Sequence, residues 1–140
     1  MKQIPVIFWT GTGNTQMMAD AIAEAINAAG AEAVVKNVSE ITAGEAAGYD
    51  AMALGCPAMG AEVLEECEFE PFFTELEGKL AGKKVALFGS YGWGGTYMQD
   101  WEARVKDAGA TLVADGVLAL GAPDDEAVAK LAEAGKLLAE

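Results

Sequence analysis

The chain has 140 residues, of which 52% are hydrophobic, 17 are glycine and none is histidine. Its nine basic and 22 acidic residues give a net charge of −13, which disfavours nucleic acid and anionic membranes as partners and favours basic proteins. Because it lacks histidine, the chain has neither the usual general base of serine hydrolases nor the commonest transition-metal ligand, so we expect no catalytic triad and no metal site.

The cysteines and the apolar runs indicate the compartment. Cys56 and Cys67 are too few and too irregularly placed for a disulfide framework or a Cys-x-x-Cys motif, so we expect two reduced thiols. The first apolar run stops at Thr10, too early for a secretory signal, and no run approaches the length needed to span a membrane. We therefore predict a cytoplasmic protein in which residues 1–140 form one domain.

Five apolar runs with the character of strands alternate with segments of helical periodicity. In chain order, strands are expected at residues 4–9, 33–35, 51–56, 85–89 and 111–120, the last bent around Asp115 and Gly116. The first expected helix spans residues 14–29 and carries the apolar stripe Met18, Ile22, Ala25, Ile26 and Ala29, and one helical turn is expected in 42–48. Two middle helices follow, one with the apolar residues Phe69, Phe72, Phe73, Leu76 and Leu80 and one with Met98, Trp101, Val105 and Ala108. A terminal helix begins at Pro123 and has the apolar face Val128, Leu131, Gly135 and Leu138. This alternation predicts an α/β fold with a doubly wound parallel sheet and helices on both faces.

Residues 10–15, between the first strand and the first helix, read Thr-Gly-Thr-Gly-Asn-Thr. The glycines let the backbone turn its N–H groups inward, and the helix N-terminus favours an anion. No Lys or Arg lies between Gln3 and Val35, so a phosphate bound here would be held by dipoles and neutral donors alone.

Several kinds of phosphate loop compete for this stretch. A P-loop needs Lys after its last glycine, where Asn14 stands. A dinucleotide fingerprint needs a third glycine, where Gln16 stands, and an acidic residue after the second strand, which is absent. Two interpretations remain: a loop for one terminal phosphate, as in FMN, or an ordinary glycine-containing turn with threonine helix caps.

The carboxyl ends of the first, third and fourth strands lead into residues 10–15, 57–62 and 90–95. Ligands of open α/β sheets bind beyond such ends, at the point where the strand order reverses. Met59, Tyr91 and Trp93 stand there between glycines and suit a planar ring with a phosphate tail. Singly, Trp93 is more typical of a partly buried surface residue and Met59 of a core filler, but three such loops together favour a cofactor site.

Three motifs carry a resemblance: FWTGTGNT at residues 8–15, LGCPAMG at 54–60 and KKVALFGSYGWG at 83–94. With residues 65–73, they resemble the short-chain flavodoxins of anaerobic bacteria over nearly the whole chain, without the long insertion of long-chain flavodoxins. The resemblance implies a five-stranded parallel sheet of order 2-1-3-4-5 and one noncovalent FMN. It implies a low-potential carrier, not an enzyme, that moves one electron at a time through the semiquinone/hydroquinone couple between redox enzymes.

The same resemblance implies the cofactor-binding residues. The phosphate would be held by Thr10, Thr12, Asn14 and Thr15 with the N–H groups of the loop, including Gly11 and Gly13. Trp93 would stack on the outer face of the ring, Met59 would pack on the inner face, Trp9 would sit beside it, and Glu62 with the backbone of Ser90, Tyr91 and Gly92 would bond its polar edge. The expected site is completed by Pro57, Ala58, Gly60, Ala61, Gly94 and Gly121. In the family, the Gly60-Ala61 peptide would turn over on one-electron reduction so that its carbonyl accepts from flavin N5–H, which glycine makes easy.

Three residues depart from the pattern of some relatives. Ala61 replaces a polar residue, Pro57 a hydroxyl near the phosphate, and Gly121 an Asn near the ring, and the loop after Gly94 is one residue shorter. These departures bear on the stability of the semiquinone and on the potentials, and not on the identity of the cofactor.

The acidic residues have two interpretations. The run from Glu65 to Glu70 is either a solvated surface or a docking site for basic redox partners, among which flavodoxin or ferredoxin reductases and oxidoreductases are the natural candidates. Glu62, Glu65 and Glu66 would also lower the potential of the reduced, anionic flavin. We expect a monomer, because no spare apolar face is evident.

Two other functions remain open at this point. A small FMN-dependent quinone or nitro reductase would need added sequence to cover a substrate over the flavin. A flavin-free receiver module would need clustered aspartates at the strand ends, where Trp9 and Cys56 stand. The carrier is favoured over both.

Overall fold

The computed structural model describes residues 2–9, 13–57, 67–91 and 97–140, and the structural statements below concern these residues. The elements in chain order are β1 (Gln3–Phe8), α1 (Asn14–Ala28), β2 (Glu32–Asn37), the 3₁₀ helix η1 (Val38–Glu40), α2 (Ala43–Ala46), β3 (Ala51–Gly55), α3 (Phe69–Glu77), β4 (Lys84–Tyr91), α4 (Tyr97–Asp107), β5 (Thr111–Leu112), β6 (Val117–Leu120) and α5 (Asp125–Ala139).

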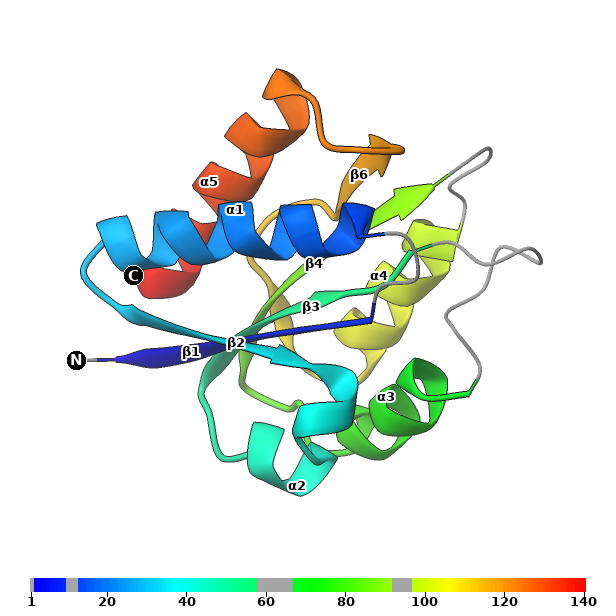
Figure 1. Ribbon diagram of the computed structural model, residues 1–140. Helices are drawn as coiled ribbons and strands as arrows, with labels where there is room; N and C mark the ends of the chain where they lie inside the picture. Colours follow the sequence, from blue (N-terminus) through cyan, green and yellow to red (C-terminus); the bar gives the residue numbers. More distant parts are fainter. Residues whose placement is uncertain (1, 10–12, 58–66, 92–96) are drawn as a thin grey trace.

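The strands form one parallel sheet in the order β2-β1-β3-β4-β5, with β6 also paired to β4 (Figure 1). The predicted strand order is therefore confirmed. In register, Phe8 of β1 lies beside Gly55 of β3, and Gly55 lies beside Phe88 of β4. The order reverses between β1 and β3, so the carboxyl ends of these two strands border the place where ligands bind in sheets of this kind.

The last predicted strand is two short strands. β5 pairs with the amino end of β4, and β6 pairs with residues Phe88 to Tyr91 at its carboxyl end. Between them the chain leaves the sheet, and there the Gly116 N–H donates to the Glu102 carboxylate on α4 at 2.7 Å. A side chain at Gly116 would overlap Met98 of α4, so the glycine permits this close approach.

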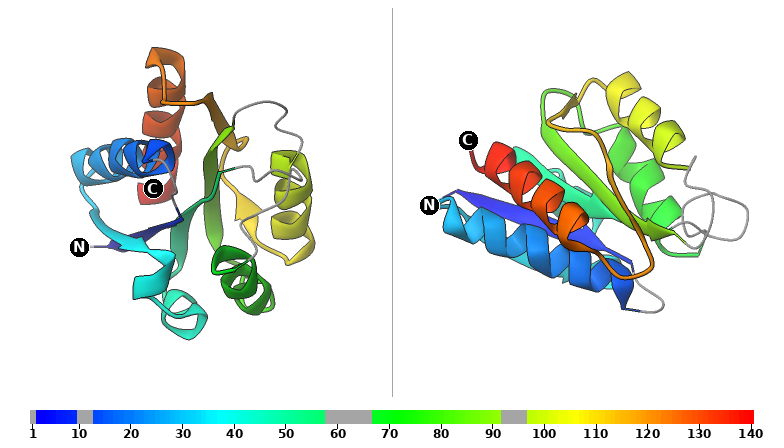
Figure 2. Two further views of the ribbon diagram at one scale, coloured as in Figure 1. Left: turned by 45° about the vertical axis from the view of Figure 1, so that its right-hand side comes forward. Right: turned by 90° about the horizontal axis from the view of Figure 1, so that it is seen from above.

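Two apolar layers enclose the sheet. α1 and α5 cover one face, and α2, α3 and α4 cover the other (Figure 2). Alternate residues of each strand supply the two layers, as Phe8 and Ile7 do on β1. Both faces of the central strands are buried, which explains their continuous apolar runs.

Most of the predicted helix faces are buried, with two exceptions on the α1–α5 side. Val128 is 41% exposed, and Ala29 lies outside α1 and is exposed, so their assignment to apolar faces was wrong. The helices approach closely at Gly135, where a Cβ would lie 2.9 Å from the Ile22 carbonyl oxygen. Near the start of α5 the buried residue is Ala127, and its neighbour Val128 faces outward.

No helix in the described parts of the chain has the length and apolar character needed to cross a membrane.

Candidate functional site

The structure places eight of the predicted site residues, and all eight lie at the carboxyl edge of the sheet or in the first turn of α1. They are Trp9, Gly13, Asn14, Thr15, Pro57, Ser90, Tyr91 and Gly121. Backbone hydrogen bonds align the strand ends, from Trp9 N–H to Gly55 O at 3.0 Å and from Gly121 N–H to Tyr91 O at 3.1 Å. Outside the described residues lie Thr10, Gly11, Thr12, Ala58, Met59, Gly60, Ala61, Glu62, Gly92, Trp93 and Gly94, whose roles stay predictions.

The N-terminus of α1 has the features of an anion site. Gly13 precedes the helix with a φ of 95°, a left-handed conformation that glycine adopts readily. Gly13 has no side chain with which to cap the helix, and the first turn of α1 contains no acidic residue. The threonine cap considered above involves Thr10 and Thr12, which lie outside the described residues, and the first turn of α1 places no carboxylate against the positive end of the dipole.

Thr15 and Ser90 meet directly beneath this helix end. Their hydroxyl oxygens lie 3.2 Å apart, and both residues are buried although they are 75 positions apart in the chain. The contact joins the first turn of α1 to the end of β4. It brings together the first and third of the predicted loops.

Trp9 is half-buried against the apolar layer under α3 and α4. Its indole N–H donates to the Glu68 carboxylate at 3.3 Å. Sequence reasoning gave Glu68 no place at the site, and no sequence pattern relates two residues that are 59 positions apart. The bond fixes an acidic group beside the end of β1.

A second contact that the sequence did not predict links the residue after β3 to α4. The buried Tyr97 hydroxyl donates to the Cys56 carbonyl at 2.8 Å, and burial raises the pKa of the Tyr97 phenol well above its usual range. Gly89 lies under this bond, and a side chain there would overlap both partners. The one available signal was a glycine inside a strand, which often marks a close approach. The bond fixes the stem after β3 relative to the start of α4.

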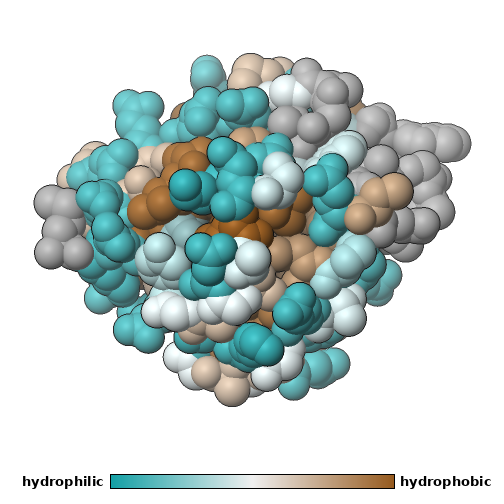
Figure 3. Space-filling model, turned by 60° about the horizontal axis from the view of Figure 1, so that its bottom comes forward, coloured by the Kyte–Doolittle hydropathy of each residue, from teal (hydrophilic) through white to brown (hydrophobic). Residues whose placement is uncertain are grey.

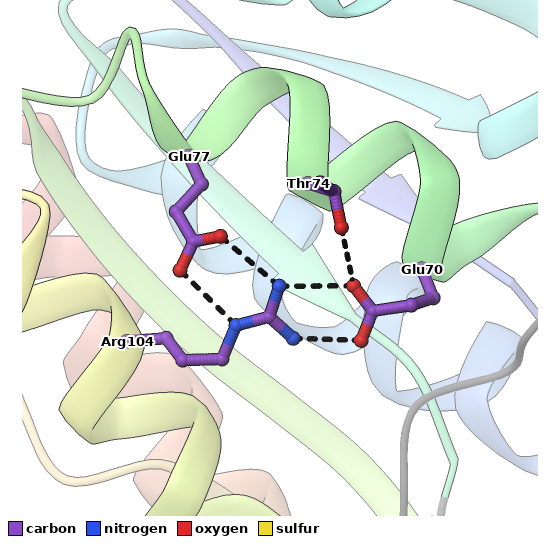
Figure 4. Close-up of polar contacts among 4 residues, drawn as sticks. All are labelled: Glu70, Thr74, Glu77 and Arg104. Carbon is purple, nitrogen blue, oxygen red and sulfur yellow. Dashed lines mark hydrogen bonds and ion pairs between the residues drawn. The ribbon is translucent and has the colours of Figure 1, made fainter.

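Arg104 of α4 binds two carboxylates of α3, as Figure 4 shows. Its guanidinium donates two hydrogen bonds to the Glu70 carboxylate, at 2.7 and 2.9 Å, and two to the Glu77 carboxylate, both at 3.1 Å. It also lies 4.8 Å from the centre of the Phe73 ring. The hydrogen bond from Arg104 lowers the pKa of the Glu70 carboxyl, against the opposing effect of its partial burial. Glu70, which belongs to the predicted acidic docking run, is thus engaged within the protein.

Replacing Arg104 with glutamine should lower the free energy of unfolding by about 1–2 kcal/mol at pH 7, because both carboxylates lose their partner while remaining partly exposed. The folded-state pKa of Glu70 is depressed, so its share of this stability is present above the unfolded-state pKa of about 4.3 and is lost as the pH falls. Urea unfolding at pH 7 and pH 3.5 measures both effects.

The matched control is Lys130→Gln, since Lys130 pairs with Glu126 at 3.3 Å on an exposed surface of α5. This change should alter stability by less than about 0.5 kcal/mol. An Arg104→Gln effect that stays the same size at pH 3.5 would contradict the role of the Glu70 carboxylate.

Among the described residues, no group of three or more metal-ligating side chains is placed to hold a metal ion.

Comparisons with known proteins agree with this geometry. The family model described as Flavodoxin matches residues 6–135. The flavodoxin of Clostridium beijerinckii is 47% identical over 135 residues, covering 96% of this chain and 97% of that protein. The flavodoxin of Megasphaera elsdenii is 47% identical over 116 residues, covering 82% of this chain and 85% of that protein.

Solved structures give the same result. The solution structure of two-electron reduced Megasphaera elsdenii flavodoxin matches with a TM-score of 0.89 and 43% identity, covering 97% of this chain and 98% of that one. The crystal structure of oxidised flavodoxin 2 from Bacillus cereus matches with a TM-score of 0.85 and 33% identity, covering 98% of this chain and 97% of that one. The chain therefore belongs to the flavodoxin family of FMN-binding electron carriers.

Proposed function

We propose that this chain, as one domain over residues 1–140, carries one electron at a time on noncovalently bound FMN between redox enzymes. The observation that carries the proposal is the N-terminus of α1, with no acidic residue in its first turn, beside the buried Thr15–Ser90 hydroxyl pair. This donor set suits a phosphate, because it offers hydroxyls and backbone dipoles with no carboxylate in the first helical turn. When bound, FMN supplies the redox chemistry, and the residues of the chain hold and orient it.

The described residues divide between the two ends of the cofactor. Asn14 and Thr15 would hold the phosphate at the α1 N-terminus. Trp9 and Tyr91, both half-buried at the ends of β1 and β4, would lie beside the ring. We assign the ring contacts of Met59, Trp93 and Glu62 on the strength of the sequence motifs alone.

The test is a visible absorption spectrum of the purified protein during stepwise anaerobic reduction with dithionite. A yellow protein that passes through a blue one-electron stage to a colourless form would support the proposal. Direct bleaching without the blue stage would favour two-electron reductase chemistry. A colourless protein that fails to take up added FMN would overturn the proposal.

A quinone or nitro reductase is the alternative considered from the sequence. The 47% identity to two flavodoxins over most of the chain favours the carrier. No contact among the described residues favours the enzyme.

We further propose that the partners present basic surfaces, that the protein is monomeric and that it acts in the cytoplasm. The net charge of −13 supports basic partners, since it attracts cationic surfaces at long range. On the face seen in Figure 3, hydrophilic side chains interrupt the apolar area in its centre, which supports a monomer.

Reversing the charge at Glu65 and Glu66 should slow reduction by a basic reductase severalfold at low salt, because electrostatic steering controls such encounters. Stopped-flow rates at about 10 mM and about 500 mM salt measure the effect, which should disappear at high salt.

The matched control reverses Glu24 on α1 and Glu133 on α5, two exposed residues on the pair of helices that covers one face of the sheet. The two double variants have the same net charge. Equal rates for both would show that the Glu65–Glu66 region is not the docking site.

A further inference from the structure

Thr15 and Ser90 are the two polar residues that are buried in the described part of the chain, with exposures of 1% and 6%. They contact each other rather than a backbone group, with 3.2 Å between their hydroxyl oxygens. A pair of hydroxyls is not needed to fill this place, because replacing both partners by apolar groups of the same shape is nearly neutral for stability. A role in ligand binding would explain why both buried positions carry a hydroxyl.

The backbone determines where Ser90 points. Along β4, Ala86 and Phe88 pack into the layer of α1 and α5, and Ser90 continues this alternation at the end of the strand. Its register partner on β6, Ala119, belongs to the same layer. Ser90 thus presents its hydroxyl to the underside of the first turn of α1, where Thr15 lies.

The number of protons limits what the pair can do. Each hydroxyl has one donor proton and can accept two hydrogen bonds. If Thr15 donated to Ser90, its proton would not be available to a ligand at the helix N-terminus. If Ser90 donates to Thr15, the Thr15 proton is free to donate outward, and the two bonds polarise each other in the same sense.

We propose that Ser90 is a positioning residue, whose side chain donates to Thr15 and thereby directs the Thr15 proton to the phosphate of FMN. The inference rests on the proposed function and deepens it, since it assigns a hydroxyl of the third loop to the phosphate end of the site. Pro57, at the end of β3, has neither a hydroxyl nor an N–H to offer there. The Thr15 hydroxyl, oriented in this Ser90–Thr15 relay, is then one of the neutral donors at the phosphate end of the site.

Ser90→Ala tests the proposal through binding, by titrating apoprotein with FMN and with riboflavin, which lacks the phosphate, and following flavin fluorescence. FMN should bind roughly three- to tenfold more weakly, because Thr15 keeps its hydroxyl but loses the group that orients it. Riboflavin affinity should stay within about twofold of the wild type. Ser39→Ala removes an exposed hydroxyl in η1 and should change neither affinity.

A double-mutant cycle with Thr15→Val separates the relay from independent effects. In the Thr15→Val background, Ser90→Ala should have no further effect on FMN affinity. A Ser90→Ala penalty that persists there would overturn the proposal, as would equal weakening of FMN and riboflavin, or no weakening of FMN. Failure of the proposed function would show differently, in a wild-type protein that takes up neither flavin, and would overturn both.

Discussion

Replacing Gly89 with alanine should lower the free energy of unfolding by about 3 kcal/mol or more, because the new methyl group has no space. It would overlap the Cys56 carbonyl oxygen and the Tyr97 hydroxyl, which are joined by a 2.8 Å hydrogen bond. One of these partners is backbone at the end of β3, so relief requires either loss of the bond or separation of β3 from β4. Urea unfolding of the apoprotein measures the loss directly.

Two further variants show which part of the contact matters. Gly78→Ala makes the same change at a position with a φ of −73° and open space around the Cβ, and should shift stability by less than about 0.5 kcal/mol. Tyr97→Phe removes the hydrogen bond without adding an atom and should cost about 1–2 kcal/mol. A Gly89→Ala protein as stable as Gly78→Ala would show that the junction relaxes and that the close approach is not required.

Thr15→Val should weaken FMN binding about 10- to 100-fold, because valine keeps the shape of threonine and removes one hydrogen bond to a charged group, worth about 1.5–3 kcal/mol. The position is 1% exposed, so water has little room to replace the hydroxyl. Riboflavin affinity should change far less, since in the proposed site the lost donor would face the phosphate. Fluorescence titration of the apoprotein with both flavins gives the two dissociation constants.

The control is Thr111→Val on β5, which pairs with the amino end of β4 and so lies at the opposite edge of the sheet. This variant should bind FMN like the wild type, and Thr15→Ser should recover most of the affinity that Thr15→Val loses. If Thr15→Val binds both flavins normally, Thr15 is a structural residue and the phosphate lies elsewhere.

Local patterns were sufficient for most of the fold. Continuous apolar runs such as Val85 to Phe88 predicted buried strands, and the spacing of Met18, Ile22 and Ile26 predicted the buried side of α1. The same patterns predicted that the first and fourth strands bring their carboxyl ends to one edge, where Thr15 and Ser90 meet in the structure.

The contacts between side chains far apart in the chain could not be predicted in this way. Arg104 meets Glu70 across 34 residues and Tyr97 meets Cys56 across 41, and periodicity carries no information about such pairs. The division of the last strand at Gly116 likewise depends on a bond to Glu102 of the preceding helix. The nearest signals were Gly89, a glycine inside a strand, and Gly116, around which the sequence predicted a bend in the last strand.

The uncharged N-terminus of α1 has a consequence for behaviour in salt. A phosphate held there displaces no counterions from basic side chains, and the net charge of −13 repels it at long range. Raising the salt from 0.01 to 0.15 M shortens the screening length from about 30 Å to about 8 Å, which removes that repulsion. FMN should therefore be retained equally well or better as ionic strength rises, while encounters with the proposed basic partners should slow. Ionic strength would then regulate electron delivery without unloading the cofactor.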